Sequence, residues 1–266
     1  MSQWLNTMGK VAIVTGGSSG IGAAIVKSLL DEDVKVANFD LSKGKEKHEN
    51  LLFLPVDVSN REQVESAVNK VVETFGTVDC LVNNAGINIP RLLVDAKESH
   101  SEYELSDAIF DKMVAVNQKG VYLMSQAVGR ILVEKKSGVI INMSSESGLE
   151  GSEGQSCYAA TKAAVNSFTR SWSKELGKHG VRVVGIAPGI MEETGLRTLS
   201  YETALAYTRN ITVDELRAGY SKISTIPLGR SGKLSEVADL VCYFMSDRAS
   251  YVTGVTTNVA GGKTRG

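Results

Sequence analysis

Residues 10–30 read KVAIVTGGSSGIGAAIVKSLL, and this stretch decides the fold. Residues 10–15 form a compact apolar run, which suits a strand that is buried on both faces. A glycine-rich turn follows at residues 16–22, and residues 23–30 have the apolar spacing of a helix. A strand, a glycine-rich turn and a helix in this order predict an α/β unit with an anion site at the start of the helix.

The glycines of this turn favour a dinucleotide. Gly16, Gly20 and Gly22 let the backbone turn tightly and approach a pyrophosphate, where the free N–H groups and the dipole of the helix favour an anion. Their spacing, G-x-x-x-G-x-G, is a variant of the usual dinucleotide fingerprint. For an isolated motif, a glycine-rich turn that binds nothing is an equally good interpretation.

An acidic residue in the next strand favours the dinucleotide. A second strand is predicted at residues 34–39, and Asp40 stands at its end, about 20 residues after the glycines. A carboxylate there can bind a ribose 2′-hydroxyl and would repel a 2′-phosphate, so we expect NAD rather than NADP. Lys43, Lys45 and Lys47 follow closely and weaken this inference, although a solvated loop is their more common role.

Beyond this unit the chain continues to alternate strands and helices. Further strands are predicted at residues 51–58, 78–82, 139–143, 181–186 and 254–259, and further helices at residues 60–75, 107–135, 158–176 and 234–245. The alternation implies an α/β fold, a Rossmann-like, doubly wound parallel sheet of about seven strands with helices on both faces. We expect residues 1–266 to form a single domain.

Polar residues stand at several predicted strand ends, where open α/β sheets bind ligands. Asp57 is a candidate for the adenine edge of a cofactor, although either Asp57 or Ser59 would also cap the helix at residues 60–75. Residues 83–86 read Asn-Asn-Ala-Gly after the strand at residues 78–82. A ligand site and a structural role, in which the asparagines tie neighbouring strand ends together, are both open.

Three segments depart from regular periodicity. Residues 87–106 are too polar for the core and predict an exposed loop. Residues 117–120, Asn-Gln-Lys-Gly, interrupt an apolar helix and predict a kink or a site. The excursion at about residues 190–230 contains only two short helical patterns, at residues 201–207 and 213–222, and predicts a lid over a substrate.

Composition excludes several classes of function. The 29 basic and 30 acidic residues leave a formal charge of −1, which gives no reason to expect a nucleic acid or an anionic membrane as partner. No apolar run approaches the ~20 residues of a membrane span, and residues 1–10 lack the regions of a signal peptide, so we expect a cytoplasmic protein. The three cysteines and three histidines are scattered, which predicts neither a disulfide framework nor a metal site.

Tyr158 and Lys162 stand four positions apart in a predicted helix, so their side chains lie on one face. A phenol titrates near pH ~10 in water and is a poor acid or base at neutral pH unless a nearby positive charge favours its anion. Lys162 could supply that charge. Alone, however, such a pair is usually no more than two exposed residues on a helix.

The motifs together resemble the short-chain dehydrogenases/reductases over nearly the whole chain. The similarity rests on the glycine turn after Thr15, the Asn-Asn-Ala-Gly run at residues 83–86, a serine 13 positions before Tyr158, the Tyr-x-x-x-Lys pair and the Pro-Gly pair at residues 188–189. The resemblance implies a Rossmann-like fold, NAD as cofactor, reversible alcohol oxidation and assembly as a homotetramer.

The resemblance also implies a catalytic set. Tyr158 matches the general acid/base, and Lys162 matches the lysine that lowers the tyrosine pKa and binds the nicotinamide ribose. Ser145 matches the serine that binds the reacting oxygen, and its neighbour Ser144 fits the spacing less well. Asn117 matches the asparagine that completes the set. The residues that match cofactor contacts are Gly16, Ser18, Ser19, Gly20, Ile21, Asp40, Asp57, Val58, Asn84, Ala85, Gly86, Tyr158, Lys162, Pro188, Gly189 and Ile190.

Two features differ from the family's pattern. The loop at residues 87–106 is longer than expected. Thr194 also lies one residue further from the Pro-Gly pair than the threonine that usually meets the nicotinamide carboxamide. Its role is therefore open, and the backbone of Ile190 is the alternative.

The closer resemblance, carried by residues 144–155 and 260–266, is to family members that oxidise D-sorbitol 6-phosphate to D-fructose 6-phosphate. It implies a sugar-alcohol phosphate as substrate, although composition and spacing identify no such ligand. Another polyol dehydrogenase, a 3-oxoacyl-acyl-carrier-protein reductase and a non-catalytic NAD-binding sensor are the alternatives. The candidate substrate residues are Arg91, Glu150, Ser152, Arg197, Lys263 and Arg265, with Glu153 beside them; for each cation, a solvated surface charge is the more common role.

Overall fold

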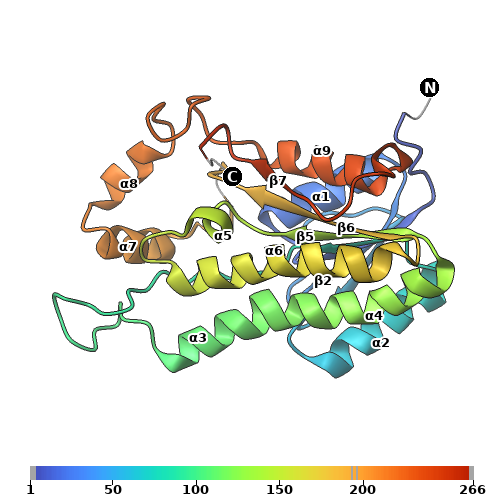
Figure 1. Ribbon diagram of the computed structural model, residues 1–266, viewed down its shortest axis with the longest axis horizontal. Coiled ribbons are helices and arrows are strands. Elements are labelled where there is room, and N and C mark those ends of the chain that lie inside the picture. Colours follow the sequence, from blue (N-terminus) through green and yellow to red (C-terminus); the bar gives the residue numbers. More distant parts are fainter. Residues whose placement is uncertain (1–3, 193, 196, 264–266) are drawn as a thin grey trace.

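The computed structural model describes residues 4–192, 194–195 and 197–263. Within these residues seven parallel strands form one sheet in the order β3-β2-β1-β4-β5-β6-β7, which confirms the predicted fold class (Figure 1). The strands are β1 (Val11–Thr15), β2 (Lys35–Asp40), β3 (Leu51–Pro55), β4 (Cys80–Asn83), β5 (Gly138–Met143), β6 (Val181–Pro188) and β7 (Thr256–Val259).

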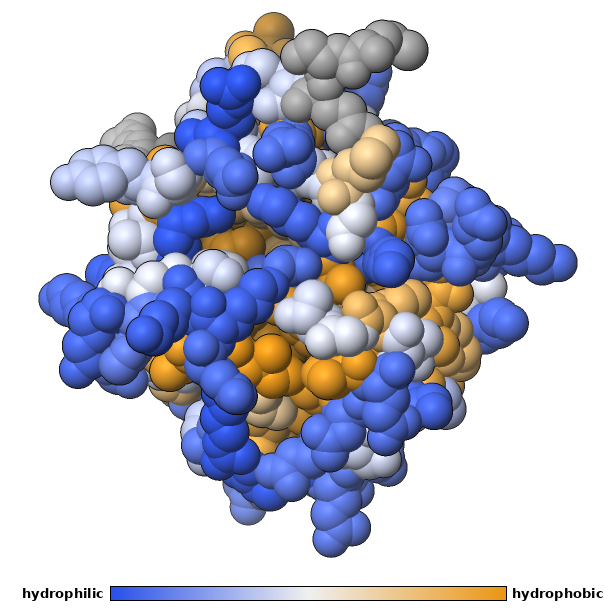
Figure 2. Space-filling view, turned by 90° about the vertical axis from the view of Figure 1, so that its right-hand side faces the viewer, coloured by the Kyte–Doolittle hydropathy of each residue, from blue (hydrophilic) through white to orange (hydrophobic). Residues whose placement is uncertain are grey.

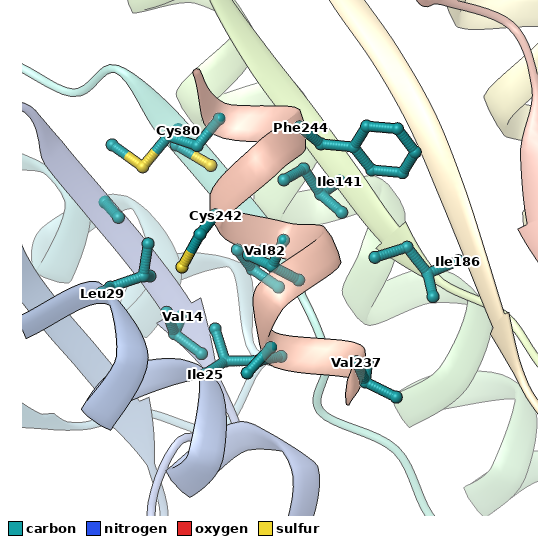
Figure 3. Close-up of a cluster of buried hydrophobic side chains, with 14 of the residues drawn as sticks. Val14, Ile25, Leu29, Cys80, Val82, Ile141, Ile186, Val237, Cys242 and Phe244 are labelled. Atoms are coloured by element: carbon teal, nitrogen blue, oxygen red, sulfur yellow. The ribbon is translucent and has the colours of Figure 1, made fainter. Parts of the chain in front are cut away.

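Helices cover both faces of the sheet. On one face lie α1 (Gly20–Asp31) and α9 (Leu234–Met245), and on the other lie α2 (Arg61–Phe75), α4 (Gly120–Lys135) and α6 (Ser156–Gly177) (Figure 1). Successive residues of β1 serve the two cores in turn, because side chains alternate along a strand. Val14 packs toward α1 and α9 (Figure 3), and Ala12 belongs to the same core, whereas Val11 and Ile13 pack toward the other face. Burial on both sides explains the continuous apolar run.

The glycine-rich turn joins β1 closely to α1. The helix begins at Gly20, before the predicted start at residue 23. A side chain at Gly22 would place its Cβ only 2.0 Å from the carbonyl oxygen of Gly16, so no larger residue fits there. The strand order reverses between β1 and β4, and the turn therefore lies at the switch point of the sheet, where α/β folds bind ligands.

Helix α2 corrects one prediction. Its N-cap is Asn60, whose side chain accepts a hydrogen bond from the Gln63 N–H, so neither Asp57 nor Ser59 caps this helix. The Asp57 carboxylate instead accepts bonds from the N–H and the hydroxyl of Ser59. This turn before the helix holds Asp57 at the end of β3 without using it as the cap.

A π-helical turn, Ala115–Lys119, connects α3 (Asp107–Val114) to α4 at the predicted polar interruption. Such turns hold one extra residue per turn and are frequent at functional sites. Asn117 occupies the middle of this turn and is fully buried. The interruption is thus a local change of helix type.

The excursion after β6 contains α7 (Leu199–Thr208) and α8 (Val213–Gly219), which confirms the two short helical patterns. Together with α5 (Ser147–Glu150), these helices lie beyond the carboxyl ends of the strands (Figure 1). The end of α7 packs tightly on the segment before α6: a Cβ at Gly154, where φ is +74°, would lie 2.0 Å from the Thr208 hydroxyl oxygen.

The loop at residues 87–106 packs on α7, so the prediction of a simply exposed loop is wrong in part. The rings of Tyr103 and Tyr207 stack with centroids 3.9 Å apart. The Tyr207 hydroxyl donates to Asp95, which is 3% exposed and also accepts from the Ser101 hydroxyl. These hydrogen bonds, that of Ser101 first, lower the pKa of Asp95 to about 2. A polar sequence has therefore buried one of its carboxylates against a second segment.

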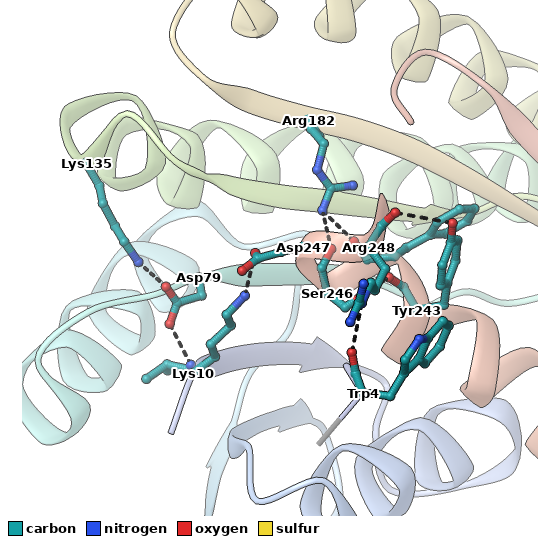
Figure 4. A network of polar contacts seen from close by, with 11 residues as sticks. Trp4, Lys10, Asp79, Lys135, Arg182, Tyr243, Ser246, Asp247 and Arg248 are labelled. Carbon is teal, nitrogen blue, oxygen red and sulfur yellow. Dashed lines mark hydrogen bonds and ion pairs between the residues drawn. The ribbon is translucent and has the colours of Figure 1, made fainter. Parts of the chain in front are cut away.

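At the amino ends of the strands, charged residues pair with one another (Figure 4). Asp79 accepts the backbone N–H of Val11 at 2.7 Å and forms an ion pair with Lys135. Lys10 pairs with Asp247 at 2.9 Å. Figure 2 looks onto this end, where hydrophilic side chains surround apolar ones that remain visible between them.

Among residues 4–192, 194–195 and 197–263, no helix is long and apolar enough to span a membrane. The same residues contain no cluster of three or more histidines, cysteines, aspartates or glutamates able to hold a metal ion. Cys80, Cys157 and Cys242 are buried and unpaired.

Candidate active site

Two neighbouring cavities open at the carboxyl ends of the strands. The glycine-turn cavity, of about 540 Å³, lies at the switch point and is lined by the turn after β1 and by the ends of β2, β4 and β5. The α7 cavity, of about 390 Å³, lies between the start of α6 and the helices α7 and α8. Five residues line both cavities: Ile21, Ser144, Tyr158, Pro188 and Thr194. Their volumes suit small ligands.

Tyr158 therefore stands at the boundary between the two cavities. Burial raises the pKa of its phenol to about 12, a hydrogen bond with Ser145 lowers that pKa, and the charge of Glu146 raises it. Of these influences burial is the largest, because removing a phenolate from water disfavours the anion. A proton is thus held on the phenol until a further influence stabilises the anion.

Lys162 lies one helical turn after Tyr158 and is 4% exposed. Its Nζ donates to the carbonyl oxygen of Met143 at 2.7 Å and lies 5.7 Å from the centroid of the Tyr158 ring. Burial lowers the pKa of Lys162 to about 8. Sequence reasoning expected the ammonium to lower the tyrosine pKa, whereas in the structure burial of the phenol outweighs every other influence.

Ser144 and Ser145 have different environments. Ser145 acts to lower the pKa of Tyr158 and lines the α7 cavity, and its hydroxyl oxygen accepts from the Ser147 N–H and hydroxyl. The Ser144 hydroxyl donates to the backbone oxygen of Lys162 and is buried. The position at spacing 13 is therefore the one beside the phenol, and its neighbour ties β5 to α6.

Asn117 lines neither cavity but lies behind the catalytic candidates. Its side chain accepts the N–H of Ile87 and donates to the Ile87 carbonyl oxygen, both at 2.8 Å. A third bond reaches the Thr161 hydroxyl at 3.2 Å. The π-helical turn thus ties the strand β4 loop to α6 beside Lys162.

The glycine-turn cavity collects most of the predicted cofactor residues. Its lining includes Gly16, Ser19, Gly20, Ile21, Asp40, Asp57, Val58, Asn84, Ala85, Gly86, Tyr158, Lys162 and Pro188. Gly189 and Ile190 line the α7 cavity instead, and Ser18 lines neither cavity. The Ser18 N–H donates to the Asp40 carboxylate at 3.0 Å and so orients it. The lysines that follow Asp40 are exposed, as expected for a solvated loop.

The asparagines after β4 have structural partners. Asn83 donates to the side chains of Ser125 and Asn142, each at 2.9 Å. Asn84 donates to the carbonyl oxygens of Thr15 and Gly16. The asparagines thus tie β4 to β5 and β1, while Asn84 also lines the glycine-turn cavity.

Thr194 lies against the glycine turn in spite of its shifted position. A Cβ at Gly20 would lie 3.3 Å from the Cβ of Thr194, and Thr194 lines both cavities. Thr194 is therefore placed to meet ligands in either cavity.

The candidate substrate residues separate into two groups. Glu150, Ser152, Arg197 and Lys263 line the α7 cavity. Arg91 does not line this cavity: its guanidinium lies over the Tyr103 ring, 5.8 Å from the centroid, and donates to the Pro90 carbonyl oxygen. Glu153 is also outside the lining, and Arg265 lies outside the described residues.

Several polar residues that line the α7 cavity were not predicted as site residues from the sequence: Asn88, Glu146, Gln155, Tyr201 and Arg209. Glu146 forms an ion pair with Lys263. Gln155 donates to the Tyr201 hydroxyl at 2.8 Å. For Glu146 and Gln155, the sequence signal was their position in the run at residues 144–155. For Tyr201 and Arg209, the sequence showed only a weak helical pattern.

The comparisons with known proteins agree with this geometry. The short chain dehydrogenase family matches residues 10–204. The chain is 62% identical to sorbitol-6-phosphate 2-dehydrogenase of Klebsiella pneumoniae, over 100% of both chains, as the closer resemblance predicted. It is 36% identical to a 3-oxoacyl-(acyl-carrier-protein) reductase of Thermotoga maritima, over 96% of this chain and 97% of the relative.

Solved structures give the same result. The crystal structure of a 3-ketoacyl-(acyl-carrier-protein) reductase from Brucella melitensis complexed with NADH has a TM-score of 0.81 and 29% identity, over 97% of this chain and 100% of the other. The aldohexose dehydrogenase of Thermoplasma acidophilum, in ligand-free form, has a TM-score of 0.83 and 26% identity, over 97% and 95%. The chain belongs to the short-chain dehydrogenase family of oxidoreductases.

Proposed function

We propose that this protein is an NAD-dependent dehydrogenase that reversibly oxidises D-sorbitol 6-phosphate at C2 to D-fructose 6-phosphate. The observation that carries the proposal is the 62% identity, over the full length of both chains, with the relative named sorbitol-6-phosphate 2-dehydrogenase. The arrangement of Tyr158 between two cavities supports it, because a hydride transfer needs a cofactor and a substrate on either side of one proton-transferring group.

In the oxidation, the Tyr158 phenolate accepts the proton of the C2 hydroxyl as the C2 hydride leaves. Ser145 holds the same oxygen through its hydroxyl. NAD supplies the hydride acceptor when it is bound. The Lys162 ammonium, held by the Met143 carbonyl oxygen, favours the phenolate form of Tyr158, which is the form that takes up this proton. In the reduction Tyr158 returns the proton to the carbonyl oxygen.

The glycine-turn cavity fits the proposed cofactor. The close approach of Gly22 to Gly16 leaves the backbone at the start of α1 without side chains that would keep a pyrophosphate away. The Asp40 carboxylate lines the same cavity and is oriented by the Ser18 N–H. A ribose 2′-hydroxyl can donate to this carboxylate, whereas a 2′-phosphate would be repelled.

Substitution of Asp40 tests the choice of cofactor. In Asp40→Ala the kcat/KM with NAD should fall by about 10- to 100-fold, since a hydrogen bond to a charged group is worth roughly 1.5–3 kcal/mol. The kcat/KM with NADP should rise, because the repelling charge is gone. Steady-state kinetics with both cofactors measure the ratio, and an unchanged preference would contradict the role given to Asp40.

The substrate is tested by a panel of sugar alcohols, each with and without a 6-phosphate, assayed with NAD and NADP by the appearance of NADH or NADPH. We expect D-sorbitol 6-phosphate with NAD to be preferred. A 3-oxoacyl thioester is assayed in the reverse direction, by the disappearance of NADH or NADPH, because the more distant relatives are named as reductases of such substrates. Its turnover with NADPH would favour the reductase alternative, and no turnover of any compound would favour a non-catalytic sensor.

Assembly and location follow from the same proposal. We expect a homotetramer in the cytoplasm, with residues 190–230 acting as a lid over the substrate, and residues 1–266 as one domain. Light scattering of the purified protein checks the subunit number.

A further inference from the structure

The cations around the α7 cavity differ in whether a carboxylate already neutralises them. Arg197 pairs with Glu202 at 3.4 Å, and Arg217 pairs with the same carboxylate at 2.7 Å. Lys263 pairs with Glu146. Among the described residues, Arg209 has no carboxylate within 4.0 Å, and it is the lining cation left with its charge uncompensated.

Arg209 stands at the C-cap of α7 and is half-buried. Its Nη2 donates to the Ser152 hydroxyl oxygen at 3.1 Å, and its Nε donates to the carbonyl oxygen of Glu153 at 3.5 Å. Both acceptors are neutral. A guanidinium has five N–H donors in a planar fork, so three of them have no acceptor within the described part of the chain.

Close packing holds the segments on both sides of Arg209 in place. The segment at residues 151–155 meets α7 through the close contact between Gly154 and Thr208, next to Arg209. Ser152 in turn donates to the Gln155 side chain at 2.7 Å. These contacts fix the guanidinium at the wall of the cavity, because the backbone on both sides of it is held.

A second donor lies beside it. The Tyr201 hydroxyl accepts from Gln155, and within the described chain its own hydrogen has no acceptor. The pKa of Tyr201 is raised, by burial first, and the charges of both Tyr158 and Arg209 act on it. Tyr201 therefore lies near the proton-transferring phenol as well as near the guanidinium, and it connects the two along the wall of the α7 cavity.

We propose that Arg209, with the Tyr201 hydroxyl beside it, binds the phosphate of the substrate and so determines the preference for a phosphorylated sugar alcohol. The inference rests on the proposed function and names the residue that selects its substrate. A planar fork with free donors matches a phosphate dianion, and the substrate's phosphate lies at the opposite end of the carbon chain from the reacting C2. Tyr158 holds C2, and Arg209 holds the phosphate.

Three glutamates besides Glu146 line the α7 cavity, but none of them occupies the place beside Arg209 that the phosphate would take. Glu215 accepts the backbone N–H and the hydroxyl of Thr212 in the capping box of α8. Glu150 and Glu192 also line the cavity, and Glu192 accepts the Leu234 N–H. None of the three is within 4.0 Å of a guanidinium nitrogen of Arg209 in the described structure.

The test compares Arg209→Met with Arg197→Met, because both remove a guanidinium from the same cavity. For each variant, kcat and KM are measured with D-sorbitol 6-phosphate and with D-sorbitol, at saturating NAD. In Arg209→Met the KM for D-sorbitol 6-phosphate should rise about 100-fold with kcat largely retained, and the preference over D-sorbitol should collapse. Arg197→Met should keep the preference, since Arg217 still neutralises Glu202.

A preference that survives in Arg209→Met, or that is lost in Arg197→Met alone, overturns the inference. Should Arg209→Met fail to fold, Arg209→Lys carries the test: it keeps the charge without the fork and should give a smaller rise in KM, whereas an unchanged KM overturns the inference. If the unaltered protein itself does not prefer D-sorbitol 6-phosphate, the proposed function fails instead. The two failures are therefore distinguishable.

Discussion

At the amino ends of the strands the cations Lys10 and Lys135 each pair with an aspartate (Figure 4), whereas at the carboxyl ends Lys162 and Arg209 contact only neutral oxygens of the described chain. The same strands therefore end in two kinds of polar surface. Pairing at one end joins neighbouring elements of the fold. At the other end Lys162 and Arg209 leave charge available to a phenolate and to a phosphate, although burying such a charge costs stability.

The largest effect on activity is expected from Tyr158→Phe, because this substitution removes only the proton-transferring oxygen at the carboxyl ends of the strands. The kcat should fall by about 10²- to 10⁴-fold, the range for general acid/base catalysis. The melting temperature and the dissociation constant for NAD should change little, since the ring remains. Steady-state kinetics, thermal melting and NAD titration measure these quantities.

Tyr251→Phe is the matched control, since Tyr251 is fully exposed. Its kcat should equal that of the unaltered protein. Retention of more than a tenth of the activity by Tyr158→Phe would show that another group transfers the proton.

Lys162→Met tests the stability cost of the buried cation at the carboxyl ends, through the pH dependence of the unfolding free energy. The pKa of Lys162 is lowered by burial from 10.5 to about 8, so between those values the unfolded chain binds more protons than the folded one. The buried Lys162 charge therefore destabilises the folded protein fully below about pH 8, and this destabilisation is relieved as the pH rises toward 10.5. The free energy of unfolding of the unaltered protein should therefore rise relative to Lys162→Met by up to about 3 kcal/mol across this window.

Urea denaturation of both proteins at several pH values measures the difference, and the common titration of other groups cancels. A constant difference across the window would mean that the lysine is solvated as an ordinary surface residue. Activity should be lost in Lys162→Met at every pH, although the variant gains stability relative to the unaltered protein below about pH 8.

Asp79→Ala tests the paired end and should have the smallest effect. It leaves the Val11 N–H without its acceptor and Lys135 without its partner, which should cost about 1–3 kcal/mol of unfolding free energy. The kcat should be unchanged. Asp79→Asn keeps an acceptor for the N–H and should lose less, while Lys10→Met, which breaks a mostly exposed ion pair, should lose about 0–1 kcal/mol. Equal losses in all three variants would contradict the distinction.

The sequence predicted the fold well because each signal acts over a few residues. Runs of buried apolar residues located β1, β4, β5 and β6, and α9 has the predicted bounds of residues 234–245. The Tyr-x-x-x-Lys pair needed only helical spacing to place both side chains on one face. Errors at the starts of α1 and α2 arose where several residues of similar capping ability stand in a row.

The α7 cavity could not be predicted in the same way. Arg91 and Arg209 are both half-buried arginines beside irregular segments, and local sequence does not distinguish them. Their roles depend on which ring or carboxylate another segment brings near. Arg91 meets Tyr103, whereas among the described residues Arg209 donates only to hydroxyl and carbonyl oxygens. Such pairings belong to the packing of the loop at residues 87–106 on α7, which no periodicity encodes.

The π-helical turn Ala115–Lys119 has a consequence for how this protein tolerates change. Because each residue of an α-helix advances by about 100° around the axis, loss of one residue from that turn would rotate α3 by that angle relative to α4. The side chain of Asn117 would then face away from Ile87, although the residue itself is unchanged. In this segment the length of the chain is under as strict a constraint as its composition, and insertions or deletions should be excluded where many substitutions are accepted.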